Sequence, residues 1–373
     1  MFTRTRSTGL HALTITAMAT ALFGCGGGGG GGDSTTGTPV ATSYTATCAG
    51  GTTTTSASSV ADAAAQCPVV PIVSSLVTSV PVATYAALSE ELAAFNLLNA
   101  ERGRCGFGLL AQNTQLDTAA KGHADWQLVN NYRGHYQTTG TQLFTGATPE
   151  DRITVAGYGD VSTFSAADEI STVLGTSVNL GMGGNQTRVL LNAPYHMKGL
   201  LGNFRDIGIA VRNSVDTAST YGPRVVVQFN LAHKASDGPQ QFTSGDVQTY
   251  PCEGSRDIKP SLNNETPNPV PGRNLATNPL GSSVYIAVRE GQTLAITSTG
   301  MINVATGASV LLRPAVTSAN DPYAPCASGC YKSHEAYIAA DAPLDANTKY
   351  QVTVSGTNNG TSFSRTFTFT TGG

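Results

Sequence analysis

Charged side chains are scarce in this sequence. They make up 12% of its 373 residues, about half of the ~25% that is usual for soluble domains. The formal net charge at pH 7 is only −3. A protein that binds nucleic acid needs a clustered basic face to neutralise phosphates, and no such cluster is found along the chain. The balance predicts a neutral secreted protein with no nucleic-acid partner.

The common signatures of catalysis are also absent. The chain has no Gly-x-Ser-x-Gly segment, which excludes the nucleophile elbow of α/β-hydrolases. His334-Glu335 begins like the zinc-binding pattern HExxH, but the second histidine is missing. The glycines of Gly181–Gly184 do not form the GxGxxG pattern of dinucleotide-binding proteins. The sequence therefore offers no ready-made hydrolase or nucleotide site.

None of the seven cysteines lies in a CxxC pair, so a zinc site built from thiolates is not expected. One of the seven, Cys25, ends the N-terminal apolar run. The others are even in number, which suits disulfides in an oxidising compartment. The sequence leaves many pairings open, and proximity favours three of them. These pairs are Cys48–Cys67, Cys326–Cys330 and Cys105–Cys252.

Residues 1–25 are typical of a lipoprotein signal peptide. Two arginines precede the apolar run Leu10–Leu22, which is too short to span a membrane. Leu22-Phe23-Gly24-Cys25 resembles a bacterial lipobox, in which the cysteine is acylated. The alternative is an ordinary cleaved signal that leaves a free thiol. We expect lipidation at Cys25 and an anchor in the bacterial cell envelope. Gly26 favours the outer membrane, with the protein periplasmic or exposed at the surface.

Composition divides the rest of the chain into four parts. Residues 26–87 are rich in Gly, Thr and Ser, which predicts a disordered tether. Helical patterns followed by strand patterns predict an α+β domain over residues 88–255. Prolines and turn residues predict a linker over residues 256–275. Strand patterns alone predict an all-β sandwich over residues 276–373.

Two helices are expected at the start of the α+β domain. Ser89, followed by two glutamates, is a good N-cap for the first. Asn113 or Thr114 caps the second. That second helix carries His123 on its apolar stripe, and a buried structural histidine is the favoured interpretation over a ligand.

The later part of the α+β domain is less regular. Residues 134–185 are expected to be mostly loop. Thr187–Asn192 is either a short helix that Pro194 ends, or the approach to a helix that carries His196. Period-two alternation predicts two strands, around Ile207–Val211 and Val225–Leu231. Further strands are expected in the tail, at Val284–Val288, Leu294–Thr297, Ser309–Leu312, Ala336–Ala339, Tyr350–Val354 and Phe363–Thr370.

A series of short motifs runs from about Leu88 to His233. In chain order they are Asn99-Ala-Glu-Arg102, Gly108-Leu109-Leu110, His123-Ala124, His135, Ala156-Gly157-Tyr158, Glu169-Ile170, His196, Ile207-Gly208-Ile209 and Val227-Gln228-Phe229. The ordered set resembles CAP domains, which occur in cysteine-rich secretory proteins, antigen-like venom proteins and plant pathogenesis-related proteins. The resemblance implies a CAP-type α–β–α sandwich with a large central cleft.

The resemblance also implies that two histidines and acidic residues meet in that cleft. His135, Glu169 and His196 stand at the matching positions. A second acidic residue, common in animal members, has no clear match, and Asp168 is the available substitute. Imidazoles and a carboxylate can hold a divalent cation such as zinc or move a proton near neutral pH. The tail resembles a bacterial Ig-like module through Leu344–Val354 and Thr366–Thr371.

Three functions remain compatible with the sequence. The favoured one is a non-enzymatic, lipid-anchored module that binds a lipid or another envelope component, with a cleft able to hold a divalent cation. The alternative is a metal-dependent hydrolase or peptidase, with His135 and His196 on zinc and Glu169 as general base. A second alternative is an adhesin-like structural protein that acts through the Ig-like domain, for which the cleft is dispensable.

Overall fold

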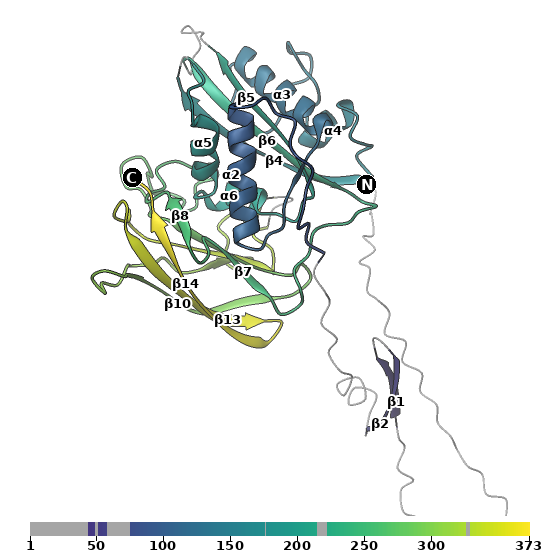
Figure 1. Ribbon diagram of the computed structural model, residues 1–373, viewed down its shortest axis with the longest axis vertical. Coiled ribbons are helices and arrows are strands. Elements are labelled where there is room, and N and C mark those ends of the chain that lie inside the picture. The colour runs from purple at the N-terminus through teal and green to yellow at the C-terminus, as the bar shows by residue number, and fades with distance from the viewer. Residues whose placement is uncertain (1–43, 49–50, 58–74, 176, 215–221, 326–328) are drawn as a thin grey trace, which may run out of the picture. The chain divides into compact units, whose positions relative to one another are not determined.

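The computed structural model describes residues 44–48, 51–57, 75–175, 177–214, 222–325 and 329–373 (Figure 1). The chain divides into two compact units, Met1–Ile72 and Val73–Gly373. In the first unit β1 (Tyr44–Cys48) and β2 (Gly51–Ala57) pair in antiparallel fashion. The prediction of a disordered tether is therefore wrong for these two stretches. Cys25 and Cys67 lie outside the described residues.

A four-stranded sheet with the strand order β3-β5-β6-β4 forms the centre of the α+β part. The strands are β3 (Ala111–Gln112), β5 (Asp206–Ser214), β6 (Arg224–Lys234) and β4 (Phe164–Leu174). β3 runs parallel to β5, and the other pairs are antiparallel. Both faces of β6 are buried along almost all its length, which explains why apolar residues occupy consecutive positions on it.

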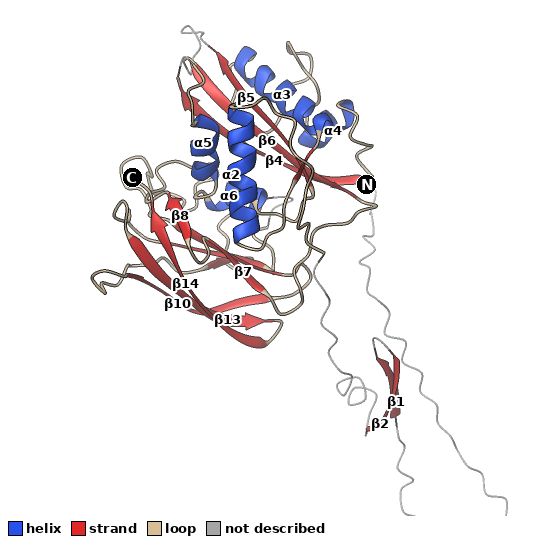
Figure 2. Cartoon of the chain, viewed as in Figure 1, coloured by secondary structure: helices blue, strands red, loops and turns tan. Residues whose placement is uncertain are grey.

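Helices cover both faces of this sheet (Figure 2). α3 (Thr114–Val129) and α4 (Pro149–Val155) pack on one face. α2 (Glu90–Arg104), α5 (Met182–Leu190) and α6 (Pro194–Leu200) pack on the other. The α–β–α arrangement that the resemblance implies is confirmed.

The helix starts follow capping rules. The Ser89 hydroxyl accepts a hydrogen bond from the backbone N–H of Leu92, as predicted. At α3 the cap is Asn113 rather than Thr114, because the Asn113 side chain accepts from the N–H groups of Gln115 and Leu116. Pro194 stands at the first turn of α6, where its missing N–H costs nothing. Both interpretations of this segment hold in part, because Thr187–Leu190 is the end of the short helix α5 and a second helix, α6, begins at Pro194 and carries His196.

The prediction that residues 134–185 are mostly loop is wrong in three places, one of which is the start of α5 at Met182. This range contains α4 and the whole of β4, which pairs with β6 from Phe164 to Leu174. β4 lacks a simple alternation of apolar and polar residues, and Asp168 and Glu169 interrupt its centre. Both carboxyl groups are buried, so contacts with distant parts of the chain, rather than local pattern, establish this strand.

The C-terminal part is all-β, as predicted, and contains two four-stranded sheets among the described residues. One sheet has the order β10 (Leu294–Asn303), β13 (Lys349–Asn358), β14 (Thr361–Thr371) and β8 (Ser255–Ile258). The other has the order β11 (Val316–Thr317), β12 (Glu335–Ala339), β9 (Ser283–Val288) and β7 (Val247–Tyr250). Ser309–Leu312 is not a strand, since it makes only isolated bridges with Ile302 and Ala340.

The boundary between the α+β part and the β-sandwich differs from the prediction. β7 lies within the range predicted for the α+β domain, yet it pairs with β9 of the sandwich. β8 begins at the end of that range and pairs with β14. Within the predicted linker, Leu262 bridges to Leu280 and both side chains are buried. Residues 256–275 are therefore part of the folded body and not a free connection.

The α+β part and the sandwich share one hydrophobic core. A single cluster of buried side chains extends from Phe95 and Leu98 of α2, through Phe229 of β6, to Ile286 of β9 and Val352 of β13. This continuity makes the described residues between 75 and 373 one packed body.

The predicted disulfide Cys105–Cys252 is confirmed, with 5.5 Å between the two Cα atoms, and it joins the end of α2 to the segment after β7. Cys330 is also disulfide-bonded, while its predicted partner Cys326 lies outside the described residues.

The end of the predicted tether is packed as well. The Leu109 N–H donates to the carbonyl oxygen of Val77 at 2.8 Å. The Tyr85 hydroxyl donates to Asp117.

Helices in the described ranges are too short or too polar to cross a membrane.

Gly208 on β5 allows α3 to approach the sheet closely. A Cβ atom at this position would lie 2.0 Å from the backbone carbon of Leu116. The Ile209 N–H next to it donates to Asp117 Oδ1 at 2.9 Å. We expect Gly208→Ala to lower the free energy of unfolding by about 1–3 kcal/mol, because the helix must move away from the sheet. Urea denaturation followed by circular dichroism measures this change.

Gly300→Ala on β10 is the matched control, since a Cβ atom there meets nothing within 4 Å. An equal loss of stability in both variants would contradict the close approach of α3 to β5.

Candidate functional site

The three residues singled out in the sequence line one cavity. His135 comes from the loop after α3, Glu169 from β4 and His196 from α6, and the cavity has a volume of about 440 Å³. Thr266 and Tyr323 from the C-terminal part line it too. The cavity is therefore built jointly by the α+β part and the segments that follow it.

Asp168 is the hydrogen-bonding centre of the site. Its Oδ1 accepts from His135 Nδ1 at 2.9 Å. Its Oδ2 accepts from Arg152 Nη2 at 3.0 Å and from Gln228 Nε2 at 3.2 Å. Burial raises the pKa of Asp168, but the hydrogen bond and charges of His135 and Arg152 outweigh burial and hold the pKa below its usual range. Asp168 is thus ionised, beside His135.

The loop that carries His135 is held by a second histidine. His123 Nε2 donates to the carbonyl oxygen of Gly134 at 2.8 Å, and the Gln137 amide donates to His123 Nδ1 at 3.1 Å. His123 is fully buried and stacks on Trp126. Burial and the nearby Arg152 charge lower its pKa to about 4. The prediction of a buried structural histidine is confirmed, and its role is to fix the backbone next to His135.

His135 presents its second ring nitrogen to the cavity. Its Nδ1 donates to Asp168, which leaves Nε2 without a hydrogen bond to any described residue. Burial lowers the pKa of His135, yet the hydrogen bond and charge of Asp168 outweigh burial and raise it. The imidazole therefore gains a proton more readily than a free histidine.

Glu169 faces the opposite side of the sheet from Asp168, because adjacent residues of a strand project to opposite faces. It lies against Gly199 of α6, where a Cβ atom would come within 1.7 Å of Glu169 Oε1. Its side chain is buried and makes no hydrogen bond to a described residue. Burial raises the pKa of Glu169 well above its usual range, and the charges of Asp168 and Glu265 add to this. The neutral carboxylic acid is the favoured form.

Glu265 is a site residue that the sequence analysis missed. Its Oε1 lies 3.4 Å from His196 Nδ1 and accepts from the Tyr195 N–H at 2.6 Å. The Glu265 side chain has no exposed surface. Burial raises its pKa, while His196 and the backbone donors oppose that rise. Glu265 falls in the range predicted as linker, so no local pattern linked it to His196.

The two histidines are oriented in the same way. Each has Nδ1 directed at a carboxylate, Asp168 for His135 and Glu265 for His196. Metal-binding histidines commonly show this arrangement. However, in the ranges that the structure describes, no group of three or more His, Cys, Asp or Glu side chains is placed to hold a metal ion. Two imidazoles are fewer ligands than a tight zinc site uses, so the donor set does not fit one.

Comparison with known families identifies the α+β part. The family model of the cysteine-rich secretory protein family, CAP, matches residues 95–228. The chain carries a CAP domain. The match covers α3, α4 and most of the central sheet, including His135, Glu169 and His196. It ends before Glu265 and the β-sandwich, for which the resemblance to an Ig-like module remains a prediction.

A solved structure with sequence similarity to this chain is an extracellular protein containing an SCP domain from Bacillus anthracis str. Ames. The two chains are 24% identical, and the match has a TM-score of 0.30. It covers 38% of this chain and 39% of that chain, so it spans well under half of the relative's length. No curated protein matches the chain.

The buried His123 makes stability depend on pH. With a pKa of about 4 in the folded state and about 6.5 in the unfolded state, the unfolded chain binds the proton first as the pH falls. The free energy of unfolding should therefore drop by about 3 kcal/mol between about pH 6.5 and 4 because of this residue alone. Replacing it, as in His123→Gln, should remove that part of the pH dependence, as measured by urea denaturation at several pH values.

His334→Gln serves as the control for this experiment, because His334 is partly exposed and makes no hydrogen bond to a described residue through its side chain. If the stability curves of wild type and His123→Gln ran parallel across the window, His123 would not be the titrating group.

Glu265 should stabilise the start of α6 as well as the position of His196. We expect Glu265→Ala to cost about 1–3 kcal/mol of unfolding free energy, since the Tyr195 N–H is left buried and unpaired. Glu265→Gln keeps an acceptor at that N–H and should cost less. Chemical denaturation of both variants tests the difference, and equal losses would show that the hydrogen bond to Tyr195 is not the source of the effect.

Proposed function

We propose that this chain is a secreted, lipid-anchored protein of the bacterial cell envelope, and that its CAP domain is a non-enzymatic module that binds a lipid or another envelope component. The proposal rests first on the cavity of about 440 Å³ that both histidines line. Ligand sites are typically concave and mostly apolar, with a few polar groups fixed in place. This cavity has that composition.

The observation that carries the proposal is the fixed orientation of the two imidazoles. Asp168 and Glu265 engage the Nδ1 atoms, so each Nε2 is left for a ligand. Polar groups that are held in position before binding lose little freedom when the ligand arrives, which favours affinity. Tyr136 lines the same cavity and is 57% exposed, so an apolar wall extends from the cavity to the surface.

The hydrolase alternative is not favoured by any contact in the site. It requires Glu169 as a general base, whereas burial next to Asp168 raises the pKa of Glu169 and keeps its carboxyl neutral. A neutral carboxylic acid does not accept a proton from water. Among the described residues, the donor set around His135 and His196 also falls short of a tight zinc site.

The adhesin alternative required a cleft that is dispensable and a sandwich that acts alone. The sandwich shares its core with the CAP domain, and Glu265, outside the matched range, contacts His196. This packing does not favour a sandwich that acts as a separate contact module. Lipidation at Cys25 and location at the outer membrane remain part of the proposal, supported by the N-terminal sequence.

Binding of a fluorescent phospholipid, such as pyrene-labelled phosphatidylglycerol, tests the proposed function. Cys25→Ser protein, which cannot be acylated, should bind the probe. Adding His135→Ala and His196→Ala should weaken binding about tenfold or more, because two fixed polar anchors are lost. Fluorescence titration measures both affinities.

Lys349→Ala is the control for the phospholipid titration, since Lys349 is exposed on β13 and does not line the cavity. The proposed lipid ligand would be ruled out if the Cys25→Ser protein did not bind the probe, or if the histidine variants bound it with unchanged affinity.

A further inference from the structure

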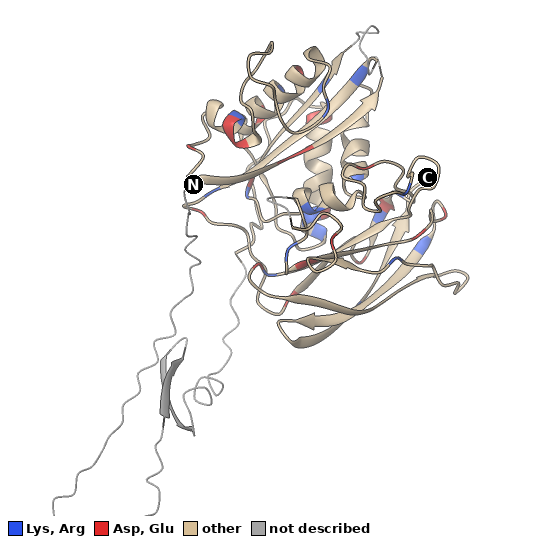
Figure 3. Cartoon of the chain, turned by 180° about the vertical axis from the view of Figure 1, so that it is seen from behind, with Lys and Arg blue, Asp and Glu red and all other residues tan. Residues whose placement is uncertain are grey.

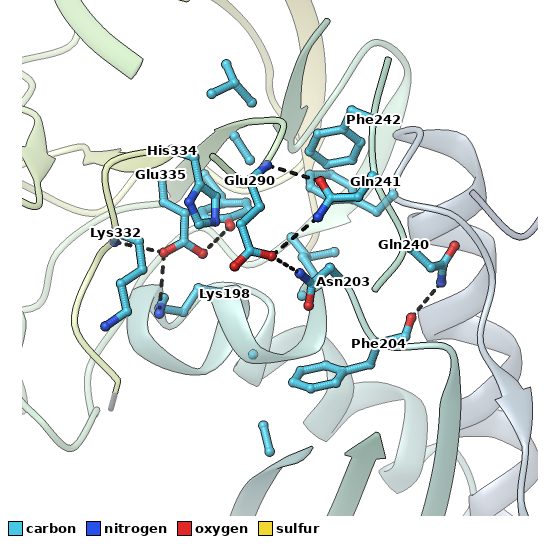
Figure 4. A pocket seen from close by; sticks show the side chains of 18 of the residues that line it. Lys198, Asn203, Phe204, Gln240, Gln241, Phe242, Glu290, Lys332, His334 and Glu335 are labelled. Atoms are coloured by element: carbon cyan, nitrogen blue, oxygen red, sulfur yellow. Dashed lines mark hydrogen bonds and ion pairs between the residues drawn. The ribbon is translucent and has the colours of Figure 1, made fainter. Parts of the chain in front are cut away.

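A second cavity, of about 270 Å³, lies between the CAP domain and the β-sandwich (Figure 4). The CAP side contributes α6 and the turn that follows it. The sandwich side contributes β9 and the segment that leads into β12. Neither His135 nor His196 lines this cavity, but Glu169 and Tyr195 line both cavities. The two cavities are neighbours with a common wall.

Hydrogen-bond donors gather on one side of this second cavity. Figure 4 shows Lys198, Lys332 and His334 together there. Lys198 Nζ donates to the carbonyl oxygen of Cys330 at 3.0 Å, and it lies 3.4 Å from Glu335 Oε2 and 5.6 Å from the centroid of the Tyr331 ring. One of its three protons is left without an acceptor oxygen among the described residues. The Lys332 ammonium makes no ion pair with a described residue, and the His334 ring makes no hydrogen bond to one.

Three of the four carboxylate oxygens of Glu335 and Glu290, which line the cavity, are already engaged, and Glu290 Oε1 accepts no hydrogen bond from a described residue. Glu335 Oε1 accepts from the Tyr285 hydroxyl at 2.8 Å, and its Oε2 accepts from the Lys332 N–H at 3.0 Å. Glu290 Oε2 accepts from Asn203 at 2.6 Å and from Gln241 at 3.3 Å.

Glu169, at 7% exposure, is buried without a hydrogen bond to a described residue. Burial and neighbouring carboxylates raise its pKa, so it adds a donor. A ligand that complements this set must bring acceptor oxygens.

The opposite wall is aromatic. Phe107, Phe204 and Phe242 line it, and the rings of Phe107 and Phe242 meet edge to face with centroids 5.7 Å apart. Such a wall suits a flat or compact apolar group. At ≈30 Å³ for each water-sized group, the cavity has room for roughly nine such groups.

We propose that this cavity binds a small organic carboxylate with a compact apolar body. The carboxylate faces Lys332, His334 and the free proton of Lys198, and the body lies against the phenylalanine wall. The site depends on both parts of the chain, because Lys198 comes from α6 and the other two donors come from the segment before β12.

Calorimetric titration of the full chain with benzoate tests this inference. Wild type should bind, and Lys332→Glu should weaken binding about tenfold or more, the factor expected for loss of one charge-assisted hydrogen bond. Lys349→Glu, on an exposed residue outside the cavity, should leave the affinity unchanged.

Benzyl alcohol, a neutral analogue of similar shape, supplies a control that needs no variant, and it should bind at least about tenfold more weakly than benzoate. The inference is overturned if wild type gives no binding heat with benzoate, or if benzyl alcohol binds equally well. It is also overturned if Lys332→Glu keeps the full affinity, or if Lys349→Glu loses it, because the ligand would then occupy another site.

Discussion

The candidate site depends on one buried carboxylate, that of Asp168. It accepts hydrogen bonds from His135 in a loop, Arg152 on α4 and Gln228 on β6. A buried charge is costly unless it is paired and hydrogen-bonded, so this group persists only if all three partners stay in place. The same contacts that keep Asp168 ionised therefore fix the loop against the helix and the sheet. The contacts that position this wall of the cavity are therefore the same contacts that stabilise the fold around Asp168.

Strand alternation then separates two carboxyl groups that are neighbours in the chain. Asp168 faces the layer of α3 and α4, where the Arg152 guanidinium and the His135 imidazole contact it. Glu169 faces α6 and Gly199, where none of the described residues donates a hydrogen bond to it. One group is ionised and orients an imidazole, and the other is neutral and lies between two cavities. Environment, not residue type, assigns their roles.

The sequence predicted the features that local rules control. Ser89 and Asn113 are helix caps whose partners lie within a few residues, and β5 and β6 show their burial in their own pattern. β4 was not predicted, because its central carboxyl groups are buried by residues that lie far away in the sequence. Glu265 was not predicted as a site residue for the same reason, since it lies 69 positions after His196 in the sequence. His135, Glu169 and His196 came from the resemblance, which local pattern alone would not have provided.

The candidate site of this chain extends beyond the CAP domain, because the α+β part and the sandwich are packed together. The matched region ends at residue 228, yet the segments after it provide Glu265, which contacts His196, and part of the cavity wall. β7 and β8, which both enter the sandwich sheets, lie just before and just after the disulfide-bonded Cys252. A CAP domain cut at the family boundary would lose a buried carboxylate that orients one of its two histidines. The unit on which the proposed ligand binding depends is therefore the whole packed body, and the sandwich is a structural part of the cavity rather than an appended spacer.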